Sequence, residues 1–274
     1  MTLKTRNNLI KIFLIASLAL TAFVLIIFAI CSYTHTILTP PELRIPAFLN
    51  HIPFAKTNFA ATMISFFILL FYVPVCFYLI IRLFENTQTS EIIFFTGFLF
   101  ACLCETARFL TICLGLWQTF SNSLIFAGTV VLFGRTLAPL SFLCAALLSE
   151  TSQRQDVERN YVILMAASIV FAVLIPMNTA RISSSGLVTE GFMTVINIFR
   201  ALILLTSLAS FLIQGFKKNS MEYKHLASSS CVLLLGYSLL ISADNFFFMI
   251  LGTFALVAGT LRYLSYLHKM YMWS

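Results

Sequence analysis

Four charged residues lie deep inside long apolar stretches of the sequence. They are Glu105, Arg108, Arg135 and Arg200. A charged side chain at the centre of a membrane helix costs about 2.5–3.5 kcal/mol on insertion scales, so such residues are paired or face water. Arginine carries a planar fork of donors that suits carboxylates and phosphates. These residue types therefore predict either internal ion pairs or a binding site for an anion.

The spacing of these residues predicts that they meet. Glu105 and Arg108 are three residues apart, which places them on one face of a helix, and Asn197 and Arg200 share that spacing. We expect the polar spots of three helices to lie at a similar depth, with an acidic residue at a nearby outer hinge. The predicted ligand-binding set is Arg108, Arg135, Arg200, Glu105, Asn197 and Asp244.

Two neighbours of Arg135 favour a site at its position. Pro139 follows four residues later, and a proline has no amide hydrogen for the carbonyl of the residue four positions before it. We therefore expect a bend beside the charge. Gly134 has no side chain and allows a second helix to approach closely.

The composition shows what kind of fold must carry these charges. Of 274 residues, 60% are apolar and 10% are charged, and the mean hydropathy is +0.96. Soluble domains have about 45–50% apolar and about 25% charged residues. This composition excludes a soluble enzyme, a nucleic-acid-binding module and a disordered protein. It predicts an all-α, polytopic transmembrane helical bundle that forms a single integral membrane domain over residues 1–274.

The apolar runs predict eight membrane spans. Their approximate bounds are 12–31, 59–81, 92–116, 124–148, 161–177, 192–213, 227–242 and 246–266. The last two come from one stretch that would make a helix of about 60 Å, twice the thickness of the hydrocarbon core. We therefore divide that stretch at Asp244 and Asn245. The longest connection, 32–58, contains four prolines and is expected to be an outer loop that could act as a flap.

The distribution of lysine and arginine predicts the orientation. Basic residues concentrate in cytoplasmic loops of helical membrane proteins. With eight spans, 11 basic residues fall on the side of the termini and three on the other. With seven spans the numbers become nine and five, so eight is preferred and seven remains the alternative. We expect a multi-pass protein of the plasma (inner) membrane with both termini cytoplasmic.

Metal, cofactor and catalytic chemistry have little support in the sequence. All seven cysteines fall in apolar runs without a CxxC pair, and all four histidines fall in predicted loops or the C-terminal tail. We expect buried thiols without a disulfide framework, no metal and no cofactor. Glu105 is the one carboxylate predicted deep in a span, so paired-carboxylate catalysis is not expected and an enzyme is not favoured.

Three hypotheses for function follow. The first is a non-enzymatic membrane protein that binds a small anionic or lipid-headgroup ligand through its arginines, as a transporter or as the input module of a sensor. Its partners would be membrane lipids, an anionic small molecule and a membrane or signalling protein, with no nucleic acid. The second is a structural subunit of a membrane complex, in which the charges hold helices together. The third is a membrane enzyme that acts on a lipid-linked substrate.

Overall fold

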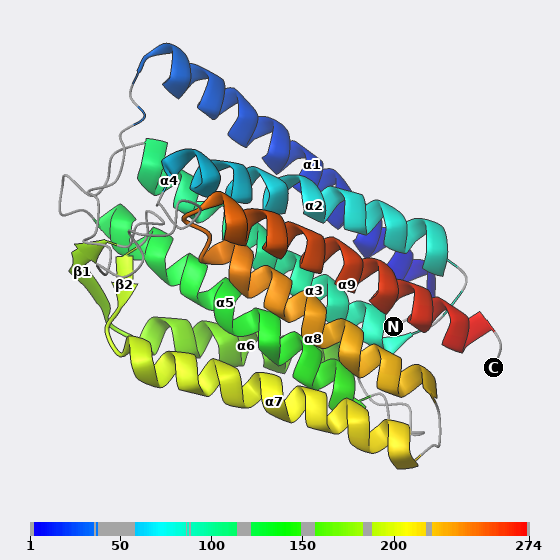
Figure 1. The fold of residues 1–274 in the computed structure, drawn as a ribbon. Coiled ribbons are helices and arrows are strands. Elements are labelled where there is room, and N and C mark those ends of the chain that lie inside the picture. Colours follow the sequence, from blue (N-terminus) through cyan, green and yellow to red (C-terminus); the bar gives the residue numbers. More distant parts are fainter. Residues whose placement is uncertain are drawn as a thin grey trace.

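The computed structural model forms an elongated bundle of helices (Figure 1). It describes residues 3–35, 37, 58–85, 87, 89–113, 122–148, 157–182, 188–217 and 221–272. Within this part of the chain, eight helical segments are long and apolar enough to cross a membrane. This finding supports an integral, multi-pass membrane protein that is largely helical.

The elements follow the predicted runs closely. The helices are α1 (Leu3–Tyr33), α2 (Phe59–Phe84), α3 (Ser90–Cys104), α4 (Ala107–Cys113), α5 (Asn122–Leu148), α6 (Val157–Leu174), α7 (Met193–Lys217), α8 (Met221–Ile241) and α9 (Phe246–Met272). Two short strands, β1 (Met177–Ile182) and β2 (Val188–Glu190), pair antiparallel between α6 and α7. The helices extend beyond most predicted bounds because helical hydrogen bonding continues into the polar flanks of each apolar run.

Two details of the predicted spans are wrong. The third span, expected as one helix over 92–116, is broken into α3 and α4. The fifth, expected over 161–177, ends at Leu174, and Met177 already belongs to β1. Apolar composition does not distinguish a helix end from the first residue of a strand, so the hairpin of β1 and β2 was not expected.

The division of the last apolar stretch is confirmed. α8 ends at Ile241 and α9 begins at Phe246. Asn245 caps α9, because its side-chain oxygen accepts a hydrogen bond from the amide of Phe248 at 2.9 Å. The amide of Asn58, just before α2, donates to the carbonyl of Asp244 at 2.7 Å and joins this turn to α2. The greater part of the predicted outer loop 32–58, residues 38–57, lies outside the described residues.

The core is concentrated in the middle of the bundle. Buried aromatic side chains of α2, α3, α5, α8 and α9 pack together, including Phe77, Phe95, Phe98, Phe142 and Tyr263. In contrast, α1, α6 and α7 leave most of their apolar side chains exposed, as expected for helices that face lipid. The two ends of the chain lie at the same end of the bundle, and the β1–β2 hairpin lies at the other (Figure 1).

Arg6 ties the start of α1 to the end of α2. Its side chain is 3% exposed and donates hydrogen bonds to the carbonyls of Phe84, at 2.6 Å, and Thr87. The adjacent Asn7 donates to the carbonyl of Glu85 at 2.8 Å. The last carbonyls of a helix have no partner within it and carry partial negative charge, so a cation stabilises them.

Replacing Arg6 with alanine is therefore expected to lower the free energy of unfolding by about 1.5 kcal/mol, the lower end for hydrogen bonds from a charged group. Thermal unfolding in detergent would measure the loss. Lys11→Ala is the matched control, because Lys11 is an exposed cation of the same helix. Equal stability of the two variants would show that Arg6 does not cap α2.

Candidate functional site

The third membrane segment is interrupted at Glu105 and Thr106. Here the amides bond three residues back: Thr106 donates to Leu103 at 2.9 Å, and Arg108 to Glu105 at 3.1 Å. The hydroxyl of Thr106 also donates to the Leu103 carbonyl at 2.6 Å. A side-chain donor that competes for a helix carbonyl favours such a tightened turn. The break places Glu105 at the junction of α3 and α4.

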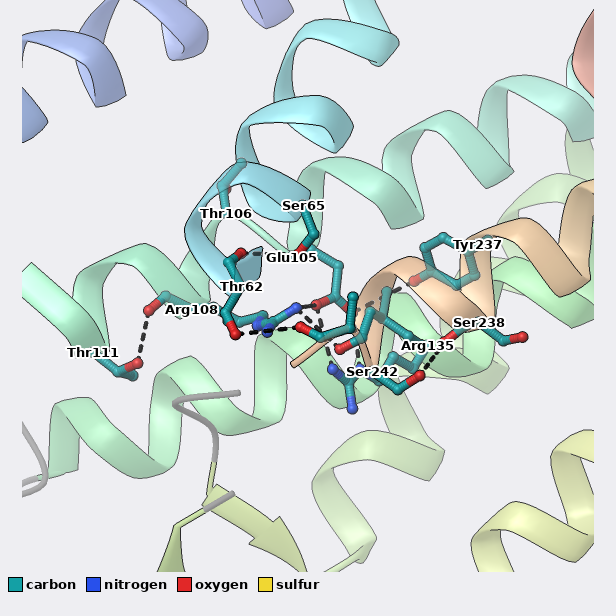
Figure 2. Close-up of polar contacts among 12 residues, drawn as sticks. Thr62, Ser65, Glu105, Thr106, Arg108, Thr111, Arg135, Tyr237, Ser238 and Ser242 are labelled. Carbon is teal, nitrogen blue, oxygen red and sulfur yellow. Dashed lines mark hydrogen bonds and ion pairs between the residues drawn. The ribbon is translucent and has the colours of Figure 1, made fainter. Parts of the chain in front are cut away.

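Glu105 is the centre of a buried ion-pair cluster (Figure 2). Arg135 of α5 bonds it side-on, with Nε 2.8 Å from Oε1 and Nη2 3.4 Å from Oε2. Arg108 of α4 donates from Nη1 to Oε2 at 3.3 Å. The hydroxyl of Tyr237, on α8, donates to Oε1 at 3.5 Å. Side chains of α4, α5 and α8 therefore converge on the carboxylate of Glu105.

Gly134 allows α5 to reach this carboxylate. A Cβ at this position would lie 2.7 Å from Cβ of Cys104 and 2.8 Å from the carbonyl oxygen of Ala101. Both distances are shorter than van der Waals contact, so a larger residue would push α5 away from α3. The close approach expected at Gly134 is confirmed, and it brings the next residue, Arg135, within reach of Glu105.

The two arginines of the cluster differ in exposure. Glu105 and Arg108 are each 1% exposed, whereas Arg135 is 16% exposed. Arg108 also donates to the carbonyl of Ile241 at 3.2 Å, at the end of α8. Two cations on one anion give the cluster a formal charge of +1. Arg135 uses Nε and Nη2 for Glu105, and none of its hydrogen bonds within the described chain uses Nη1.

Arg200 belongs to a second, neighbouring pair. Its Nη2 lies 2.7 Å from Oε1 of Glu190, the last residue of β2, and its Nη1 lies 3.4 Å from the side-chain oxygen of Asn197. The expected contact between Asn197 and Arg200 is therefore present. Arg200 does not join the other two arginines at Glu105, because the hairpin supplies a separate carboxylate, that of Glu190.

The two pairs are neighbours. Glu190 is near enough to Arg135 for an electrostatic interaction, although no hydrogen bond or ion pair joins the two within the described chain. We call these five residues the charge row; it comprises the cations Arg108, Arg135 and Arg200 and the anions Glu105 and Glu190. Glu190 also lines a hollow of about 390 Å³ with Asn178 and residues 191–195 at the start of α7. The row thus extends from the bundle core to a cavity beside the hairpin.

Asp244 lies in the predicted hinge but does not make the expected contact with a membrane arginine. It lies in the turn between α8 and α9, where its carbonyl accepts the amide of Asn58. Among the described residues, its carboxylate forms no ion pair with Arg135 or Arg200. The hinge is where the sequence predicts it, but the α8 residue that reaches Glu105 is Tyr237.

Two residues of the site were missed in the sequence. Glu190 falls between predicted spans, and its use depends on the hairpin that returns it to α7. Tyr237 lies within a predicted span, where a tyrosine also serves as an ordinary core residue. A signal for Glu190 was available, because it lies ten residues before a membrane arginine that needs a partner.

The cysteines and carboxylates of the described residues give no metal site. No group of three or more histidine, cysteine, aspartate or glutamate side chains among them could hold a metal ion. Five of the seven cysteines are buried and two are partly buried. Both oxygens of Glu105 accept hydrogen bonds from cations, so this carboxylate serves as their counter-ion.

The comparisons with known proteins add no family to this description. No protein-family model matches the chain, and no curated protein is significantly similar to it. The charge row and the eight apolar helices are therefore the features from which a function can be inferred.

Proposed function

We propose that this multi-pass membrane protein binds one small anion, with a carboxylate or phosphate group, at Arg135. The observation that carries the proposal is the guanidinium of Arg135, which Glu105 holds in place, which is 16% exposed, and whose Nη1 forms no hydrogen bond within the described chain. A largely buried guanidinium with an unused donor is costly unless an anion or water satisfies that donor. Arg135 is the accessible member, so the anion would bind there.

The geometry supports a preorganised donor. Glu105 holds Arg135 by two hydrogen bonds, at 2.8 and 3.4 Å, and thereby fixes the plane of its guanidinium. Nη1 then offers its hydrogens to a ligand in a fixed direction. A donor that is already oriented loses less conformational entropy on binding. In this arrangement Glu105 positions Arg135, and Arg108 balances the charge of Glu105 when the ligand balances that of Arg135.

The proposal includes an orientation. Lys4, Arg6, Lys217, Lys224 and Lys269 belong to helix ends on the side of the two termini. We assign this side to the cytoplasm because of the positive-inside rule. The charge row and the hairpin then lie toward the outer side of a plasma (inner) membrane. A ligand would approach from outside, as expected for a transporter or for the input module of a sensor with a separate signalling partner.

A structural role is the second candidate, and Arg108 is the residue that favours it. Arg108 is enclosed, and it links α4 to Glu105 and to the end of α8. Buried polar contacts of this kind join membrane helices and contribute roughly 0.6–2 kcal/mol each. Arg108 therefore fits helix–helix attachment, whereas the exposed edge of Arg135 fits ligand binding. A membrane enzyme is not favoured, because Glu105 is held as a counter-ion.

Anion-dependent stabilisation tests the proposal. Thermal unfolding of the purified protein would be measured with chloride, acetate, sulfate and phosphate at constant ionic strength. A ligand at one hundred times its Kd stabilises by about 2.7 kcal/mol. We expect at least one polyatomic anion to stabilise the wild type and to have no effect on Arg135→Gln. This variant should fold, because it leaves a neutral pair of Glu105 and Arg108.

Matched variants and lipids identify the kind of ligand. Arg200→Gln should keep the stabilisation, because Arg200 belongs to the second pair. Stabilisation by phosphate in detergent indicates a free anion. Stabilisation in phosphatidylglycerol nanodiscs relative to phosphatidylcholine nanodiscs, without an effect of phosphate, indicates a lipid headgroup. Equal responses of the wild type and Arg135→Gln to every probe would contradict the proposal.

A further inference from the structure

Two cysteines from different helices meet at the end of the bundle opposite the termini. Cys31 lies two residues before the end of α1, and Cys113 is the last residue of α4. Both belong to one small cluster of buried side chains, where they are 9% and 3% exposed. The two thiols are therefore neighbours in this cluster, close enough to interact electrostatically.

The packing one turn earlier gives independent evidence for this meeting. Phe28 of α1 and Phe109 of α4 have ring centroids 6.2 Å apart. Cys31 follows the first ring by three residues, and Cys113 follows the second by four. Because α1 and α4 run in the same direction, the contact between the two rings is followed one turn later by a contact between the two cysteines. The cysteines therefore meet because of the helix packing, and each occupies the last turn of its helix.

We propose that Cys31 and Cys113 form a disulfide that fastens α1 to α4. The proposal rests on the orientation given above, which places this end of the bundle on the outer side. Disulfides form and persist in oxidising outer compartments and are rare in the cytosol. The disulfide would stabilise α1 in particular, because this helix is largely exposed and packs mainly against α2 and α4.

The chemistry is thiol–disulfide exchange with a protein disulfide donor of the outer compartment. One cysteine thiolate attacks a donor sulfur, the donor S–S bond breaks, and a mixed disulfide forms. The second cysteine, as its thiolate, then attacks the sulfur of its partner and releases the donor as a dithiol. Two electrons pass to the donor, and the two protons lost by the cysteines balance those gained by the donor. Because both sulfurs are buried in the fold, the exchange takes place while α1 docks.

A second pair of cysteines provides an internal control. Cys76 of α2 and Cys102 of α3 also lie close enough to interact electrostatically. Both are buried, at 2% and 1% exposure, and both lie inside their helices, away from the ends. A soluble disulfide donor cannot reach that depth. We expect this pair to remain as thiols although its members are also neighbours.

The test traps thiols in intact cells with N-ethylmaleimide before the membranes are solubilised. Non-reducing digestion and mass spectrometry then identify the state of each cysteine. We expect a peptide in which Cys31 is linked to Cys113, and alkylated Cys76 and Cys102. Alkylation of both Cys31 and Cys113 in the trapped protein would overturn the proposal, as would linkage of either residue to another cysteine.

A stability measurement gives the second readout. Reducing agent should lower the melting temperature of the wild type and leave that of Cys31→Ser unchanged. Cys76→Ser should still respond to the reducing agent like the wild type. These outcomes do not depend on anion binding, so failure here and failure of the Arg135 proposal can be told apart. An unchanged melting temperature of the reduced wild type would contradict a disulfide that fastens α1.

Discussion

Replacing Glu105 with glutamine is expected to destabilise the protein by about 3–5 kcal/mol, the largest effect of any single change considered. Glutamine keeps the size of the side chain but removes the carboxylate that pairs with both Arg108 and Arg135. Breaking a buried ion pair by removing one partner leaves an uncompensated charge in a low-dielectric interior. Here one substitution removes the carboxylate that pairs with two arginines at once.

Denaturation in detergent with a matched set of variants would measure this effect. Glu190→Gln is the control, because it breaks the neighbouring pair with Arg200, whose side chains are more exposed. Glu190→Gln should lower the free energy of unfolding by clearly less than Glu105→Gln does. A double variant, Glu105→Gln with Arg135→Gln, should regain part of the stability, because it leaves one buried cation instead of two. A Glu105→Gln protein as stable as the wild type would show that the cluster does not depend on its carboxylate.

The second large effect is expected at Gly236, where α8 and α9 touch backbone to backbone. A Cβ at this position would clash with the amide nitrogen of Leu256 and would lie 2.8 Å from the carbonyl carbon of Ala255. Backbone cannot move aside as a flexible side chain can, so the helices must separate. Gly236→Val should cost about 3 kcal/mol, the upper end for overpacked cores. Because α8 also carries Tyr237, displacement of α8 would disturb the contact to Glu105.

The yield of folded, monodisperse protein and its melting temperature would measure this loss. Gly128→Ala is the control, because its nearest neighbour is the flexible Met177 side chain, with its sulfur at 3.4 Å. We expect Gly128→Ala to behave almost as the wild type does. If Gly236→Val kept the melting temperature of the wild type, the close α8–α9 contact would be refuted.

Hydrophobicity made the span architecture predictable. Runs of about 20 apolar residues indicate membrane helices with little ambiguity. The length of the final stretch required a break, and the polar pair Asp244 and Asn245 was the natural place for it. Spacing along one helix also predicted that Glu105 and Arg108 would touch, and that Asn197 and Arg200 would do so.

Contacts between helices could not be predicted in the same way. The sequence indicated that Arg135 and Arg200 needed partners, but the partner of each depends on how the helices pack. Glu190 reaches Arg200 only because a short hairpin, whose strands have no strong apolar alternation, turns it back toward α7. The break at Thr106 was similarly hidden, because one hydroxyl bound to a backbone carbonyl decides it.

The central claim is that Arg135 binds one anion per chain. Isothermal titration of the purified protein with acetate, sulfate and phosphate tests it most directly, because the titration counts bound ligand. We expect one site per chain for at least one of these anions in the wild type and in Arg200→Gln, and no measurable binding by folded Arg135→Gln. Binding by Arg135→Gln that equals the wild type would contradict the claim, as would a wild type that binds none of the three anions and is not stabilised by phosphatidylglycerol nanodiscs.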